Sequence, residues 1–243
     1  MIIKDKTRFG GVFVALLSFL IVLLYTVSIT VLVCEGQSER YLTAFSEERR
    51  KTVIIDAGHG GEDSGAVAQN GVYEKDLNLQ IAFKLGEYLT SSGYNVIYTR
   101  TDDRLLYTEE ENIKGMRKIN DLKNRVKLAN SYDDALFISI HMNSFGMESC
   151  SGLQVYYSAE SEDSRLLAES VQGEVVKRIQ PQNRRKIKNG NDIYVLENSN
   201  NPAILVECGF LSNYEESKKL CEKEYQKELS FAILCGIIEY IGK

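Results

Sequence analysis

Short apolar runs alternate with longer amphipathic segments from residue 52 to the end of the chain. The short runs are rich in β-branched and aromatic residues, which predicts strands at residues 52–56, 94–99, 135–140, 152–157 and 203–207, with a further short strand at residues 192–196. In the longer segments apolar residues recur at helical spacing, which predicts helices at residues 74–90, 118–130, 161–179 and 223–241. This alternation predicts an α/β fold with a single open, mostly parallel twisted sheet and helices on both faces.

The N-terminal part of the chain has a different pattern. Residues 10–33 contain no charged side chain, and the run is long enough for a helix that spans a bilayer core. A cleavable signal peptide has a shorter apolar region and a small-residue cleavage site, so we expect an uncleaved signal anchor, with secretion after cleavage as the alternative. Lys4, Lys6 and Arg8 precede the run, which predicts a cytoplasmic N-terminus and a main domain at the extracytoplasmic face of the cell membrane. The expected parts are a transmembrane signal anchor at residues 1–34, a tether at residues 35–51 and a catalytic domain at residues 52–243.

Composition and charge exclude one class of function. The chain has a net charge of −5, with 44% apolar and 26% charged residues, as in an ordinary globular protein. A nucleic-acid binder needs a basic face, which this charge argues against. The one basic cluster, residues 184–188 (RRKIK), is interpreted as a solvated loop, with contact to a charged ligand as the less favoured alternative. The five cysteines match no zinc-ribbon spacing, and their disulfide status stays open.

The chain contains only two histidines, and each follows a predicted strand. His59 lies three residues beyond the first strand, and His141 directly follows the strand at residues 135–140. Glu207 ends the strand at residues 203–207. Because ligands of open α/β sheets bind at the carboxyl ends of the strands, we expect these three side chains to meet at one edge of the sheet.

Two histidines at one edge favour a metal site if a third ligand lies nearby. Catalytic zinc usually takes three protein ligands and leaves the fourth position to water. Glu74 is the best candidate for the third ligand, because the glycine-containing loop after His59 leads to it. The simpler alternative is that Glu74 only stabilises the helix, since a negative charge is favourable in its first turn. A His–Glu–His set is typical of hydrolytic zinc enzymes. Glu207 is then the candidate general base and acid, since burial raises the pKa of a carboxyl group. The alternative is a structural role, in which a glutamate at the end of a strand pairs with a helix N–H group or an arginine.

Other polar residues lie near the predicted site. The glycines around His59 permit a sharp turn. Asn143 and Asp56 are candidates for binding substrate or for orienting a ligand histidine, and a turn role is equally expected for Asn143. Arg100 and Asp102 are expected to fix a loop rather than to touch substrate.

Six motifs together resemble the zinc-dependent N-acetylmuramoyl-L-alanine amidases of bacterial cell-wall turnover. They are spread over residues 52–241 and read IIDAGHGGEDSGA, EKDLNLQIAFKL, YTRTDD, RVKLAN, FISIHMNS and PAILVECGFLSN. The resemblance implies that His59, Glu74 and His141 bind Zn²⁺ and that Glu207 is the catalytic acid/base. It implies hydrolysis of the amide between N-acetylmuramic acid and L-alanine of the stem peptide in peptidoglycan. Cys208 departs from the family pattern, but its side chain should face away from Glu207.

A narrower resemblance is to the CwlD-type amidases of spore-forming bacteria. It rests on the N-terminal anchor, the bare catalytic domain and the stretch GMRKINDLKNRVKLAN. It implies a role in forming the muramic lactam of spore cortex, which germination enzymes later recognise, and a location at the forespore. Several relatives are activated by partner proteins, so an activating partner is a further expectation.

Two alternatives stay open on the sequence. A carboxypeptidase-like zinc peptidase would need an arginine near the metal, which Arg100 could supply. A cell-wall-binding module with a degenerate site is disfavoured, because all four site residues are present.

Overall fold

The computed structural model describes residues 21, 25, 26, 28, 29 and 51–243. Among these residues no helix is long and apolar enough to cross a membrane. The expected signal anchor and tether lie almost wholly outside the described residues, so both stay predictions. Lys51–Lys243 forms a compact unit of its own.

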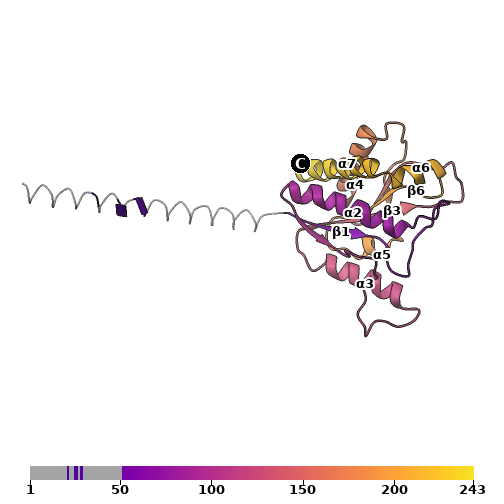
Figure 1. Ribbon diagram of the computed structural model, residues 1–243, viewed down its shortest axis with the longest axis horizontal. Helices are drawn as coiled ribbons and strands as arrows, with labels where there is room; N and C mark the ends of the chain where they lie inside the picture. Colours follow the sequence, from indigo (N-terminus) through magenta and orange to yellow (C-terminus); the bar gives the residue numbers. More distant parts are fainter. Residues whose placement is uncertain (1–20, 22–24, 27, 30–50) are drawn as a thin grey trace, which may run out of the picture. The chain divides into compact units, whose positions relative to one another are not determined.

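A six-stranded sheet forms the centre of this unit (Figure 1). In chain order the strands are β1 (Thr52–Ala57), β2 (Asn95–Tyr98), β3 (Ala135–Asn143), β4 (Gln154–Tyr157), β5 (Lys188–Asn189) and β6 (Ala203–Phe210). Across the sheet their order is β2-β1-β3-β6-β4-β5. Only the pairing of β4 with β6 is antiparallel, and the other neighbours are parallel. The predicted open, mostly parallel sheet is confirmed.

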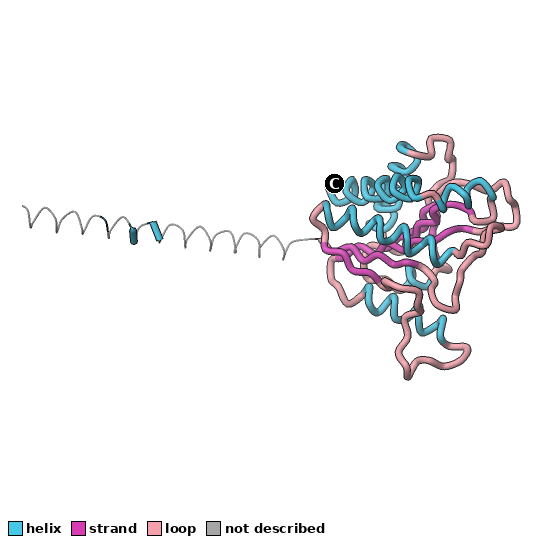
Figure 2. The backbone as a smooth tube through the Cα atoms, viewed as in Figure 1, coloured by secondary structure: helices cyan, strands magenta, loops and turns pink. Residues whose placement is uncertain are grey.

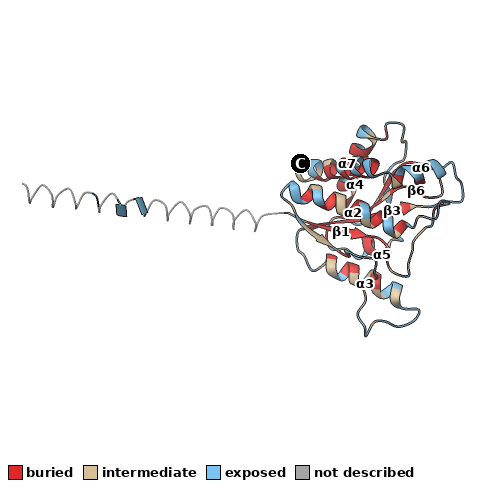
Figure 3. Ribbon diagram, in the orientation of Figure 1, coloured by how far each residue is buried: buried red, intermediate tan, exposed pale blue. Residues whose placement is uncertain are grey.

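Helices cover both faces of the sheet (Figure 2). One face carries α2 (Glu74–Ser91), α4 (Glu162–Arg178) and α7 (Lys223–Ile241), and the other carries α3 (Arg117–Ala129) and α5 (Tyr194–Glu197). A further helix, α6 (Tyr214–Cys221), follows β6. The central strands are buried between these layers (Figure 3).

Alternating strand residues build the two cores, because successive side chains of a strand point to opposite faces. Val53 and Ile55 pack in the core under α2, α4 and α7, whereas Ile54 packs in the smaller core under α3 and α5. The apolar positions that predicted α2 are all buried, namely Leu77, Ile81, Leu85 and Leu89. The helical spacing in the sequence therefore located the buried face of this helix correctly.

The strand predicted at residues 192–196 is wrong, because Tyr194–Glu197 forms the short helix α5. Val195 and Leu196 are neighbours in the chain, yet both are buried in the same core. Two successive residues of a strand cannot face one core, whereas one helical turn permits it. The edge strand β5 and the helix α6 were not predicted from the sequence. In α6 the side chain of Asn213 accepts a hydrogen bond from Glu216 N, an N-terminal capping pattern that could have been recognised.

Candidate active site

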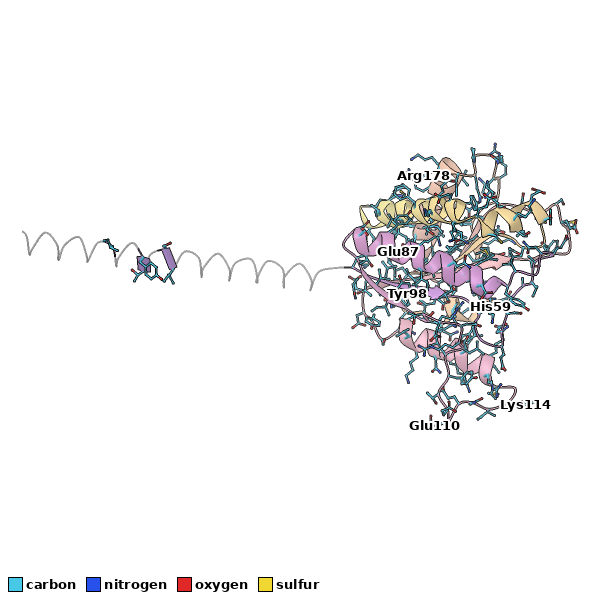
Figure 4. All side chains as sticks on the ribbon, in the orientation of Figure 1. His59, Glu87, Tyr98, Glu110, Lys114 and Arg178 are labelled. Carbon is cyan, nitrogen blue, oxygen red and sulfur yellow. The ribbon has the colours of Figure 1, made fainter. Side chains whose placement is uncertain are left out.

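Three strands bring the predicted site residues to one edge of the sheet. His59 follows β1, His141 lies near the end of β3 and Glu207 lies in β6. His141 and Glu207 are register partners in the parallel β3–β6 pair, so their side chains share a face of the sheet. In Figure 4 the labelled His59 lies near the start of α2, where Glu74 is the first helical residue. The predicted convergence of the four residues is confirmed.

Glu74 lies between the two histidines. Its Oε1 atom is 3.2 Å from His59 Nε2 and 2.9 Å from His141 Nδ1. One potential ligand atom from each of the three residues lies within 4.8 Å of the others. Zinc–ligand bonds of about 2.0–2.2 Å place tetrahedral ligand atoms roughly 3.3 Å apart. The nitrogen and oxygen donors present therefore fit a zinc ion.

Backbone donors hold the Glu74 carboxylate in this position. Met142 N donates to Oε1 at 3.0 Å and Ala66 N donates to Oε2 at 2.8 Å. The side chain is only 4% exposed. Burial by itself raises the pKa of a carboxyl, but the hydrogen bonds with His141 and His59 outweigh it and lower the pKa of Glu74 far below its ordinary value. Glu74 is therefore an anion suited to a cation site.

Asp63 fixes the orientation of His59. Its Oδ2 atom lies 2.8 Å from His59 Nδ1, which leaves Nε2 directed towards Glu74. Lys118 Nζ in turn lies 3.1 Å from Asp63 Oδ2. Burial lowers the pKa of His59, but the hydrogen bonds with Asp63 and Glu74 outweigh it and raise the pKa to about 9. A metal ion at Nε2 has to displace that proton.

Two buried arginines hold the loop that carries His59. Arg100 donates through Nε to Ala57 O at 2.8 Å and through Nη2 to Gly58 O at 3.1 Å. Arg125 donates through Nη2 to His59 O at 2.8 Å. The expectation that Arg100 fixes a loop is confirmed, whereas the role of Arg125 was missed.

Asp56 lies beneath this loop, and its hydrogen bonds do not go to the histidine rings. Its carboxylate accepts from Arg125 Nη1 at 2.5 Å, Thr99 Oγ1 at 2.7 Å and Ser139 Oγ at 2.6 Å. Burial raises its pKa, but Arg125 and the hydroxyl donors outweigh that effect and lower it below 3.8. Asp56 therefore supports the site through Arg125.

Glu207 has a buried carboxylate oxygen without a protein partner. Its Oε2 atom accepts and donates no hydrogen bond among the described residues. Burial raises the pKa of Glu207 to about 7, and the charge of Glu74 adds to the effect. A carboxyl with a pKa near neutrality and an unpaired oxygen can both accept and donate a proton. Cys208 next to it is buried in the core on the opposite face, as expected.

Comparison with known proteins identifies the family. The model of the N-acetylmuramoyl-L-alanine amidase family matches residues 53–239. The chain belongs to this family.

Individual relatives agree with the family match. The CwlD amidase from Clostridioides difficile, solved in complex with the GerS lipoprotein, is 41% identical to this chain, and the two structures superpose with a TM-score of 0.77. The match covers 79% of this chain and 99% of the CwlD chain. The germination-specific N-acetylmuramoyl-L-alanine amidase of Bacillus subtilis (strain 168) is 37% identical over 190 residues, covering 78% of this chain and 79% of that protein. The uncharacterized protein YqiI of the same strain is 41% identical over 192 residues, covering 78% and 84%. The amidase interpretation is confirmed, which decides against a carboxypeptidase-like enzyme.

The amidase has a cavity of about 430 Å³ beside the histidines, on the face covered by α3 and α5. His59 and His141 line it, together with Lys118 from α3 and Tyr194 from α5. Neither Lys118 nor Tyr194 was predicted from the sequence to lie at the site. Asn143 lies at a register shift between β3 and β6, where its carbonyl accepts from Leu211 N at 2.8 Å. A role for its side chain in substrate binding stays a prediction.

Proposed function

We propose that this amidase is zinc-dependent, with His59, Glu74 and His141 as the metal ligands and Glu207 as the catalytic acid/base. The observation that carries the proposal is the position of Glu74 Oε1, within 3.2 Å of a ring nitrogen of each histidine. Asp56 and Asn143 are proposed as supporting residues, the first through Arg125 and the second at the substrate.

When bound, zinc supplies a Lewis acid that polarises the scissile carbonyl and lowers the pKa of water. Asp63 keeps Nε2 of His59 aimed at the metal position. Glu207 takes a proton from the attacking water on its free carboxylate oxygen and later donates it to the amine of L-alanine as the amide breaks. The products are a muramic-acid carboxylate and a stem peptide with a free L-alanine amine.

Metal analysis and mass spectrometry of digested peptidoglycan test this assignment. The full chain should carry one zinc ion and release stem peptides with a free L-alanine amine. Glu207→Gln should keep zinc and lose hydrolysis, whereas Glu74→Gln should lose both. Glu87→Gln is the matched control, because Glu87 lies on the same helix but is exposed and remote from His59 (Figure 4). Hydrolysis by Glu207→Gln, or undiminished zinc in Glu74→Gln, would contradict the assignment, and an inactive wild type would favour a degenerate wall-binding module.

We also propose that residues 1–34 anchor the enzyme at the extracytoplasmic face of the cell membrane. The uncharged run at residues 10–33 and the preceding basic residues support this orientation. Fractionation of the native host should find the intact chain in the membrane, and mass spectrometry should detect its N-terminal peptides. A chain found in the medium without those peptides would instead indicate a cleaved, secreted enzyme.

A role in spore cortex muramic-lactam formation is the biological setting we propose. Similarity to the germination-specific amidase supports it, while YqiI, which is 41% identical, is uncharacterized. Because the CwlD amidase was solved in complex with the GerS lipoprotein, we propose that a partner protein binds this chain and activates it. Deletion of the gene should remove muramic lactam from spore cortex and block germination, and zinc binding should rise when the co-purified partner is present. Normal cortex in the deletion strain would place the enzyme in vegetative wall turnover.

A further inference from the structure

Arg185 belongs to the basic run at residues 184–188, but it is not a freely solvated side chain. Its guanidinium carbon lies 4.3 Å from the centroid of the Phe210 ring. Its Nε atom donates to Ser151 O at 2.7 Å, and Nη1 donates to Gln154 Oε1 at 3.3 Å. The stacking and the two hydrogen bonds hold the guanidinium in one place.

That place borders Gln154, whose side chain shares a face of the sheet with the catalytic carboxyl. Gln154 stands directly opposite Glu207 in the antiparallel β4–β6 pair, so the two side chains point to one face. Phe210 pairs with Asn143 after the register shift, and Asn143 shares the face of His141 two residues earlier. Arg185 therefore extends the row His141, Glu207 and Gln154 away from His59.

The charge of Arg185 has no direct ionic partner. Within residues 51–243 no carboxylate forms an ion pair with it; its hydrogen bonds go to a backbone carbonyl and a neutral amide. Glu216 is nearby, but its two oxygens accept from Gly152 N at 2.7 Å and Phe210 N at 2.8 Å. Arg125, by contrast, is paired with Asp56 and Asp121. An arginine that is held rigidly and lacks a carboxylate is suited to bind one from a ligand.

We propose that Arg185 binds a carboxylate of the stem peptide and is a specificity-determining residue of the amidase. The carboxyl group of N-acetylmuramic acid forms the scissile amide and therefore carries no charge in the substrate. The negative charges near the scissile bond lie on the stem peptide. Glu207 donates its proton to the leaving peptide, and Arg185 lies on the far side of Gln154 from Glu207 in the order of the strands. The inference rests on the proposed catalytic role of Glu207.

Two soluble glycan-linked stem peptides test the proposal. They are identical except that the residue after L-alanine carries a free α-carboxylate in one and a carboxamide in the other. Wild type should show a kcat/KM higher by roughly tenfold for the carboxylate substrate, as expected for a charged hydrogen bond. Arg185→Gln should lose this preference by slowing the carboxylate substrate alone, and Arg185→Lys should keep part of it because the charge remains without the planar fork.

Arg184→Gln is the matched control, because it removes the same charge from the neighbouring residue. Arg184 is exposed and donates only to the carbonyls of Pro181 and Asn183. It should behave as wild type. No preference in wild type, an equal loss on both substrates in Arg185→Gln, or the same loss in Arg184→Gln would overturn the proposal.

A second measurement separates this inference from the zinc mechanism. Calorimetric binding of both substrates to the metal-free full chain and to metal-free Arg185→Gln needs no turnover. If wild type binds the carboxylate substrate more tightly than the carboxamide substrate and Arg185→Gln does not, the role of Arg185 is supported. If wild type binds the two substrates equally, that role is overturned. An enzyme that binds selectively but hydrolyses neither substrate with zinc present would contradict the proposed function and leave the binding role of Arg185 supported.

Discussion

The guanidinium of Arg125 lies 2.5 Å from the carboxylate of Asp56, and both side chains are 1% exposed. Arg125 belongs to α3 and Asp56 to β1, so the pair joins a helix to the central sheet. The same guanidinium also donates to the carbonyls of Ala57 and His59. The pair therefore fixes the position of a proposed metal ligand although neither side chain reaches the metal position.

Arg125→Gln should destabilise the fold by about 3–5 kcal/mol, because it leaves Asp56 as a buried, unpaired charge. Chemical denaturation followed by circular dichroism measures the loss. Arg165→Gln is the control, since its ion pairs with Glu162 and Glu169 lie on the surface and it should change stability far less. Equal losses of unfolding free energy in the two variants would show that the buried pair stabilises the fold no more than a surface ion pair does.

The stabilisation from Asp56 should depend on pH. The pKa of Asp56 is lowered from its ordinary value in the folded protein, so the ionised form favours the fold and its contribution is fully present well above that ordinary value. The contribution is lost as the pH falls through the lower folded pKa. The difference in unfolding free energy between wild type and Asp56→Asn should therefore be largest near neutral pH and shrink in acid. A difference that stays constant on acidification would exclude this linkage.

Gly58→Ala should impair zinc binding, because a Cβ at this position would lie 2.0 Å from His141 Nε2. The ring must therefore leave the position in which its Nδ1 atom lies 2.9 Å from Glu74 Oε1, which disturbs the proposed set of ligands. Gly71→Ala is the matched control: it lies in the same loop, and a Cβ there meets nothing within 4 Å, although its positive φ of 81° costs some stability. Zinc titration should show weaker binding only in Gly58→Ala. Equal zinc affinity in both variants would mean that the close approach is not required.

Asp63→Asn should weaken zinc binding by about 10–100-fold, as expected for the loss of a carboxylate that orients a ligand histidine. The neighbouring substitution Glu62→Gln is the control, because Glu62 pairs with Arg117 at the surface. Competition with a chelator measures both affinities. If Asp63→Asn binds zinc as tightly as wild type, the orientation of His59 does not depend on this carboxylate.

Local pattern was sufficient for most of the fold and for the four central site residues. The helical spacing of Leu77, Ile81 and Leu85 reports a face that is buried in the structure, so it could be recognised without coordinates. The two histidines stood out because each lies at or just beyond the end of a buried apolar run, and parallel strands end at the same edge. The segment at residues 192–196 was misassigned because its apolar content fits a strand and a helical turn equally well.

The residues that were missed act through partners far away in the chain. Arg125 lies near Leu122 and Val126 on α3, and a charge on that apolar stripe was a usable signal of a buried pair. Its partner Asp56 is 69 positions away, however, and no local pattern names it. Arg185 looked like one member of a solvated basic run, because its contacts with Ser151 and Gln154 form only when the segment that leads to β5 lies beside β4.

The sequence by itself determined most of the strands and helices and the set of metal-capable side chains, because periodicity and the rarity of histidine can be recognised without the tertiary structure. Tertiary structure alone decided that β4 runs antiparallel beside β6, that Asp63 and Arg125 contact His59, and that Arg185 contacts Gln154. The physical reason is that strand order and buried ion pairs depend on contacts between distant segments, which form only when the whole core packs.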